Sequence, residues 1–207
     1  MGRQIDLRIL ELLAARLCHE LISPIGAIAN GVELLGEDDP DFVRDATALI
    51  EQSARKAGQR LQFYRFAYGS SVTGTGGGPD PRELVSGLLE GGKVSCEWRD
   101  GAETLPAEWM KLACNMVVLV AEALPRGGTI TIVSGSAAAR SLEIVGAGEA
   151  INLTGEARAA LALQAELVDL TPRTVHGYFT ARLAEALDVV LTLAEPGPRL
   201  LSLVAAP

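Results

Sequence analysis

The chain has 207 residues, of which 48% are hydrophobic and 21% are charged, a composition typical of a globular protein and not of a disordered or collagen-like one. With 18 basic and 26 acidic side chains the net charge is −8, and only 4% of the residues are aromatic. Nucleic-acid binding needs a basic surface and is helped by aromatic side chains that stack on bases. We therefore expect partners that are proteins or small molecules.

The first predicted element is a long helix over residues 1–35. Its apolar side chains recur in alternating steps of three and four residues, which is the spacing of a coiled-coil seam: Leu10, Ala14, Leu17, Leu21, Ile25, Ile28, Val32 and Leu35. Gly36 and Pro40 mark a break, and a second helix is expected over residues 41–68. Two long helices with so short a connection form an antiparallel hairpin.

The predicted hairpin has two apolar faces that it cannot bury alone. We therefore expect a homodimer in which two hairpins form a four-helix bundle. Small side chains on the second helix would let neighbouring helices approach closely: Ser53, Ala54, Ala57 and Gly58. The alternative is a hairpin packed against the rest of its own chain.

A Gly- and Ser-rich stretch at residues 69–80 is interpreted as a linker between a hairpin domain, residues 1–70, and a second domain, residues 80–207. The second domain mixes both kinds of element. Predicted helices cover residues 81–90, 106–124, 155–167 and 173–187, and predicted strands cover residues 93–98, 129–134, 141–145, 189–193 and 200–204. The fold class is therefore α+β: a helical hairpin followed by an α/β sandwich, one sheet with helices on a single face.

The cysteines and the N-terminus favour a cytoplasmic protein. Cys18, Cys96 and Cys114 are an odd number without C-x-x-C spacing, so neither a disulfide framework nor a metal site is expected. The charged N-terminus excludes the apolar core of a signal peptide. No uncharged apolar run reaches the length of about 18 residues that a membrane span needs.

Of the two histidines, only His19 is placed where chemistry is expected. His176 has no cysteine or carboxylate cluster near it in the sequence and is interpreted as a surface or capping residue. His19 lies in the middle of the first helix beside the seam, so another protein could reach its ring. By its spacing alone, a merely solvated histidine remains the alternative.

The residues around His19 resemble the phospho-acceptor segment of sensor histidine kinases, His-Glu-Leu-x-x-Pro-Leu-x-x-Ile, in register at His19, Glu20, Leu21 and Pro24. A neutral imidazole can attack phosphorus. Glu20 could accept the other ring N–H and make the attacking nitrogen more nucleophilic. Pro24 removes one helical hydrogen bond and should bend the helix. In the kinases the fourth residue after the histidine assists dephosphorylation when it is Thr or Asn, and here it is Ser23.

The second domain resembles the ATP-binding domain of these kinases with its ligand-binding residues replaced. The segment that starts at Asn115 is similar to the kinase N-box, but Leu119 stands where an Asn would hold Mg²⁺ and nucleotide, and Glu122 where a Lys would stand. Leu119 offers no ligand atom, and a carboxylate repels phosphate. Gly146 replaces the Asp that reads adenine. We expect no ATP, no other cofactor and no metal in this chain.

This combination is similar to the ChpT-type histidine phosphotransferases of bacterial phosphorelays, and more distantly to the Spo-zero-B type. The resemblance implies that His19 takes a phosphoryl group from the receiver aspartate of a hybrid histidine kinase and passes it to the receiver aspartate of a response regulator. The receiver would supply Mg²⁺. Two alternatives stay open: an active histidine kinase, and a non-catalytic dimeric adaptor or anti-kinase that binds a partner through the bundle.

The expected site lies on the hairpin around His19. His19 and Glu20 are the predicted catalytic residues. A receiver is expected to dock on neighbouring apolar, hydroxyl and basic side chains, the basic ones forming a collar around the histidine: Ile22, Ser23, Pro24, Arg16, Arg55, Lys56 and Arg60.

Overall fold

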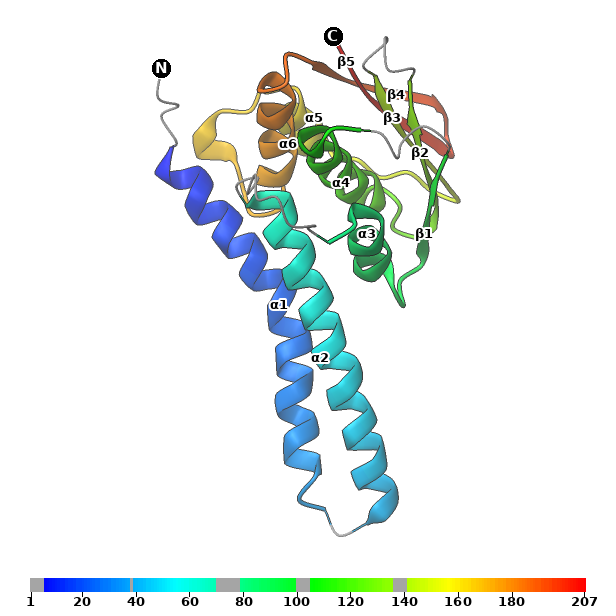
Figure 1. Ribbon diagram of the computed structural model, residues 1–207. Helices are drawn as coiled ribbons and strands as arrows, with labels where there is room; N and C mark the ends of the chain where they lie inside the picture. Colours follow the sequence, from blue (N-terminus) through cyan, green and yellow to red (C-terminus); the bar gives the residue numbers. More distant parts are fainter. Residues whose placement is uncertain (1–5, 38, 70–78, 100–104, 136–140) are drawn as a thin grey trace.

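The computed structural model describes residues 6–37, 39–69, 79–99, 105–135 and 141–207. It consists of a long helical hairpin and an α/β domain that sits at the end of the hairpin away from its turn (Figure 1). Most of the predicted linker, residues 70–78, lies outside the described residues.

The hairpin is formed by α1, Leu7–Leu34, and α2, Pro40–Tyr68. The carboxylate of Asp39 accepts a hydrogen bond from the backbone N–H of Asp41 and caps α2, whose first residue is a proline. The two helices come close at Gly31, where an added Cβ would lie 2.6 Å from Cγ1 of Ile50. The predicted hairpin is thus confirmed, with α1 beginning a few residues later than expected.

Much of the hairpin's apolar surface is uncovered in the single chain. Along α1, only Arg16, Pro24 and Gly31 are buried. The seam residues Ile25 and Val32 are 54% and 56% exposed. By length and composition alone, α1 is also apolar enough to cross a membrane, although charged residues such as Arg16 and Glu20 interrupt it and leave no uncharged run of the length stated above. The same apolar stripe is what a helix of a bundle requires.

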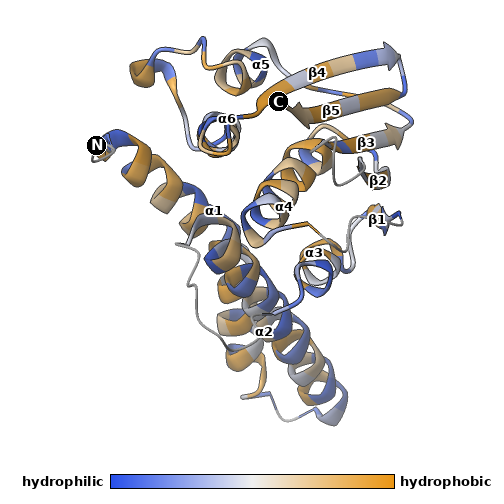
Figure 2. Ribbon diagram, turned by 45° about the horizontal axis from the view of Figure 1, so that its top comes forward, coloured by the Kyte–Doolittle hydropathy of each residue, from blue (hydrophilic) through white to orange (hydrophobic). Residues whose placement is uncertain are grey.

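The α/β domain contains one five-stranded sheet in the order β1-β2-β3-β5-β4. Its strands are β1 Val94–Trp98, β2 Gly128–Ser134, β3 Leu142–Gly148, β4 Val190–Gly197 and β5 Leu200–Ala206. β1 and β2 pair in parallel, and the other neighbours are antiparallel. The helices α3 Pro81–Leu89, α4 Ala107–Glu122, α5 Gly155–Leu161 and α6 Val175–Glu185 lie on one side of this sheet (Figure 2). The predicted α+β class is confirmed.

The largest local difference from the sequence prediction lies after α5. A helix was expected over residues 155–167, but α5 ends at Leu161, and a short 3₁₀ helix, Leu167–Asp169, follows. Leu163 has a positive φ of 55°, a conformation that L residues rarely adopt and that ends the helix. The helix-favouring residues of this segment are overruled by the turn that leads toward α6.

One core joins the hairpin to the α/β domain. α4 is apolar nearly all round because it lies between the sheet and the end of the hairpin, and it is buried on all sides along most of its length. Alternate residues of the strands face it, among them Ile130, Ile144 and Leu203. Phe63 and Ala67 of α2 belong to the same buried cluster. The α/β domain therefore packs directly on the end of the hairpin.

Candidate functional site

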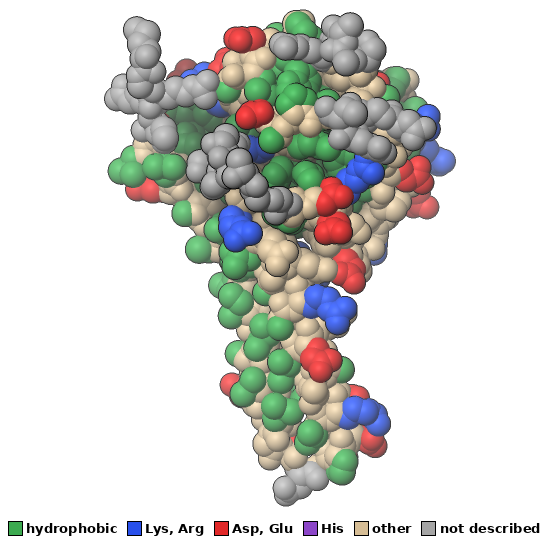
Figure 3. Space-filling view, viewed as in Figure 1, with side chains coloured by type: hydrophobic (Ala, Val, Ile, Leu, Met, Phe, Trp, Pro, Cys, Tyr) green, Lys and Arg blue, Asp and Glu red, His purple; other side chains and the backbone are tan. Residues whose placement is uncertain are grey.

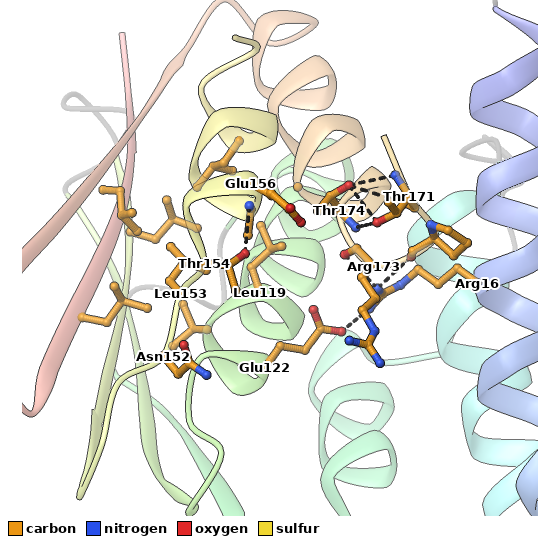
Figure 4. A pocket seen from close by; sticks show the side chains of 18 of the residues that line it. Arg16, Leu119, Glu122, Asn152, Leu153, Thr154, Glu156, Thr171, Arg173 and Thr174 are labelled. Atoms are coloured by element: carbon orange, nitrogen blue, oxygen red, sulfur yellow. Dashed lines mark hydrogen bonds and ion pairs between the residues drawn. The ribbon is translucent and has the colours of Figure 1, made fainter. Parts of the chain in front are cut away.

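His19 is exposed on α1 and lies at a cleft of about 860 Å³ between the hairpin and the α/β domain. The walls come from α1, from α4, from residues 152–157 and from the turn before α6 (Figure 4). Thr154 and Glu156 line one side, and Thr171, Arg173 and Thr174 line another. The predicted acceptor is therefore open to solvent and lines this cleft.

Arg16 was expected on the docking surface but is buried, with 5% of its surface exposed. One guanidinium nitrogen pairs with the carboxylate of Glu122 on α4, and the other donates to the carbonyls of Pro172 and Arg173, at 3.4 and 3.5 Å. Burial disfavours the charge of Arg16, but the Glu122 carboxylate, together with the side chains of Tyr68 and Tyr64, more than offsets this effect and raises the pKa of Arg16. Arg16 therefore fastens α1 to the α/β domain and is not free to bind a receiver.

Arg60 was also expected on the docking surface, but it binds Glu20. Its Nη1 lies 2.9 Å from the carboxylate oxygen Oε2 of Glu20 and 2.5 Å from the carbonyl oxygen of the same residue. Within the described part of the chain, no hydrogen bond joins Glu20 to the ring of His19, although Glu20 was expected to accept one. The structure thus directs the carboxylate of Glu20 toward α2.

The other predicted docking residues differ in exposure. Ile22 is 68% exposed, and Ser23, Arg55 and Lys56 are exposed as well. Pro24 is buried within α1, so its ring does not offer the expected apolar contact to a partner. Of the expected basic collar, only Arg55 and Lys56 are available at the surface.

The interpretation of His176 as a surface residue is wrong, because the side chain is fully buried at the start of α6. Its Nδ1 lies 3.0 Å from the hydroxyl of Tyr68, and its Nε2 lies 3.0 Å from the carbonyl of Asn115. Burial, together with the nearby positive charge of Arg16, lowers the pKa of His176 to about 3. The ring is therefore neutral, donating from Nε2–H to Asn115 and accepting from Tyr68 at Nδ1.

Further polar contacts at this junction were missed by sequence reasoning. Arg8 at the start of α1 donates to the carbonyls of Leu167, Val168 and Leu170, at 2.7, 2.8 and 3.1 Å. The side-chain amide of Asn115 donates to the carbonyl of Ala67 in α2 at 3.1 Å. Asn115 was noted as a residue kept from the kinase N-box, but nothing in the sequence indicates that it holds α2 to α4.

The described residues contain no group of three or more His, Cys, Asp or Glu side chains that could hold a metal ion. The polar groups around the cleft include the paired Arg16 and Glu122, the exposed Arg173, and hydroxyl groups. Such a surface is suited to contact with another protein's polar groups close to His19.

Comparison with known proteins identifies relatives of the chain. A family model described as the histidine phosphotransferase C-terminal domain matches residues 78–199. Protein phosphotransferase ChpT of Brucella abortus (strain 2308) is 40% identical over 126 residues, which span 58% of this chain and 58% of that protein. A solved structure of a bacterial phosphotransferase is similar with a TM-score of 0.79 and 30% identity, covering 99% of this chain and 98% of that one.

Proposed function

Because the chain belongs to the histidine phosphotransferase family, we propose that it relays a phosphoryl group between two receiver domains through His19. The donor is the receiver aspartate of a hybrid histidine kinase, and the acceptor is the receiver aspartate of a downstream response regulator. The observation that carries this proposal is the position of His19, exposed on α1 at the open cleft between hairpin and α/β domain.

Each half of the relay exchanges one bond at phosphorus. A ring nitrogen of His19 attacks the aspartyl phosphate, so the phosphorus–nitrogen bond forms as the bond to the carboxylate oxygen breaks. The second receiver's carboxylate then reverses this on His19. Both phosphorylated groups are reactive, so the protein mainly has to hold the nucleophile and phosphorus in line. Mg²⁺ would come from the receiver's own acidic pocket.

A receiver that reaches His19 would approach along α1. Ile22 and Ser23 follow the histidine on the surface of α1, and Arg55 and Lys56 are exposed on α2. An apolar centre with basic side chains near it suits the acidic surface around a receiver aspartate. The net charge of −8 does not oppose this, because attraction over a few ångströms depends on local side chains and distant charges are screened by salt.

We further propose that the functional unit is a homodimer in the cytoplasm. Hydrophobic side chains follow the hairpin down to its turn (Figure 3). Leu10, Ile25, Val32, Phe42 and Leu61 are each about half exposed or more in the single chain, at 49%, 54%, 56%, 56% and 52%. So long an apolar surface is unusual on a monomer, and pairing of two hairpins in a four-helix bundle would cover it.

The chain is also proposed to lack ATP-dependent autokinase activity. This rests on Glu122 and Leu119, which line the cleft where a nucleotide would have to sit. Glu122 is already paired with Arg16, and its carboxylate would repel phosphate groups. Labelled ATP should therefore leave the protein unlabelled, and labelling by ATP alone would favour the kinase instead.

The function is tested by incubating the protein with a panel of phosphorylated receiver domains and following transfer of the label. At least one receiver should label the wild-type protein, and His19→Gln should take up no label, because the amide cannot act as the nucleophile. His176→Gln is the matched control, since His176 is fully buried and unreachable. Labelling of His19→Gln at the wild-type rate would overturn the site, and partner binding with intact output in this variant would favour the adaptor.

A further inference from the structure

The carbonyl group directly after the predicted acceptor lacks its usual helical partner. In an α-helix the N–H of each residue bonds to the carbonyl four residues earlier. Pro24 lies inside α1 and has no N–H. The carbonyl left without a donor is therefore that of Glu20, the residue next to His19. Such a group must find another donor or lose the free energy of a hydrogen bond.

Arg60 supplies that donor from the opposite helix. Its Nη1 lies 2.5 Å from the carbonyl oxygen of Glu20 and 2.9 Å from the carboxylate oxygen Oε2 of the same residue. Both side chains are mostly covered, with 23% of Arg60 and 30% of Glu20 exposed. Hydrogen bonds between charged groups are stronger than neutral ones, and partial burial protects them from water and salt. One guanidinium thus holds both the backbone and the side chain of Glu20.

The placement of Arg60 is not the most favourable one for Arg60 itself. Its Nε is buried and has no hydrogen-bond partner among the described residues. A buried donor without a partner costs free energy that a solvent-exposed arginine would not lose. The side chain stays in this position because the two contacts with Glu20 compensate the cost.

We propose that Arg60 is a positioning residue for phosphotransfer at His19, acting through the carbonyl that Pro24 leaves free and through the carboxylate of Glu20. The inference rests on the proposed function of His19. Arg60 fixes the backbone at the residue after the acceptor and so limits the directions in which the imidazole can point. It also balances the negative charge of Glu20, which would otherwise repel an incoming phosphoryl group.

The contacts define a set of variants. Arg60→Gln removes the charge and both strong contacts. Arg60→Lys keeps a donor that can reach one of the two oxygens, so it should restore part of the rate. Pro24→Ala returns the N–H that the Glu20 carbonyl lacks, so Arg60→Gln should cost less in that background. Arg65→Gln is the matched control, because it removes the same charge from an exposed position of α2.

The experiment measures transfer from a phosphorylated receiver to His19 as a function of receiver concentration. Arg60→Gln should lower the maximal rate by about tenfold, the effect of losing a charged hydrogen bond, with a much smaller change in the half-saturating concentration. Arg65→Gln should match the wild type. Coupling with Pro24→Ala, measured as a double-mutant cycle, should make the Arg60→Gln loss several-fold smaller.

A second measurement does not depend on transfer. The carbonyl carbon of Glu20, labelled with ¹³C, should shift in Arg60→Gln and return toward its wild-type position when Pro24→Ala is added. If no receiver labels the wild type, the proposed function fails whatever Arg60 does. If the wild type is labelled and Arg60→Gln transfers at the same maximal rate, or if Pro24→Ala leaves its loss unchanged, the positioning role is wrong.

Discussion

The two ends of the hairpin are built in different ways. At the end next to the α/β domain, polar contacts tie the helices to other elements: Arg8 and Arg16 on α1 bind the turn before α6 and Glu122, and Tyr68 on α2 binds His176. Toward the turn, α1 and α2 extend away from the α/β domain (Figure 1), and Val32 and Phe42 are each 56% exposed.

The apolar surface of the hairpin is therefore covered within the single chain at one end and stays exposed at the other. At the end away from its turn, the hairpin is covered by the chain's own α/β domain, whose core includes Phe63 and Ala67 of α2. Toward its turn, the hairpin carries exposed apolar surface that a second hairpin would cover in the proposed dimer. His19 lies near the border between these regions, at the cleft. Its backbone is therefore held from one side while its ring stays accessible.

The strongest effect is expected on dimerisation, through the exposed apolar seam near the turn of the hairpin. Val32→Asp would place an unpaired carboxylate in the apolar seam, at a cost of several kcal/mol, which weakens a dimer by a factor on the order of 100 or more. Light scattering should change from about twice 21.7 kDa to 21.7 kDa. Val190→Asp is the matched control, because Val190 is 66% exposed on β4, away from the hairpin. A wild-type protein that is monomeric at micromolar concentration would contradict the bundle.

At the end of the hairpin next to the α/β domain, Tyr68→Phe should lower the free energy of unfolding by about 1–3 kcal/mol, because the buried Nδ1 of His176 loses its hydrogen-bond donor. Denaturant unfolding measures this change. Tyr178→Phe is the control, since the hydroxyl of this half-buried residue has no hydrogen-bond partner within the described ranges. Equal losses in the two variants would show that the Tyr68 contact adds little to the junction.

A pH dependence of stability is also expected at the end of the hairpin next to the α/β domain. His176 has a pKa of about 3 in the folded protein, and an unfolded histidine titrates near 6.5. Between these values only the unfolded chain takes up the proton. The contribution of neutral His176 to stability is therefore complete above pH 6.5 and declines as the pH falls, by up to about 1.4 kcal/mol per pH unit.

The measurement compares unfolding free energies of the wild type and His176→Gln at several pH values. Carboxylates titrate in both proteins, so the difference between the two unfolding free energies isolates the contribution of His176. The wild type should lose stability more steeply than the variant between pH 6 and pH 4. Parallel curves would mean that His176 can take up a proton in the folded state without cost.

Sequence reasoning succeeded where the signal is local. The break between the two long helices is marked by Gly36 and Pro40, and strands are marked by alternating apolar residues such as Ile130 and Ile132, because helix ends and periodicity depend on neighbours in the chain. It failed at residues 162–167, where helix-favouring side chains continue but Leu163 takes a left-handed conformation. It also failed for Arg16, Arg60 and His176, each of which was placed at the surface.

Those failures share a cause. Arg16 and Glu122 are 106 residues apart, Tyr68 and His176 are 108 apart, and Arg60 and Glu20 are 40 apart. The pattern of one segment cannot show which distant charge or ring it will meet. The local sequence around a buried arginine does not differ from that around an exposed one, because the residues that cover the side chain come from distant segments.

The hairpin, the α+β class and the candidate acceptor His19 follow from the amino-acid sequence alone, because they depend on periodicity and on a short motif. How His19 is held follows from the folded arrangement of the chain. It buries Arg16 against Glu122, encloses His176, and brings Arg60 to the carbonyl that Pro24 leaves free. These contacts depend on folding because a buried polar group is tolerated only with a partner, and here the partner comes from a distant part of the chain.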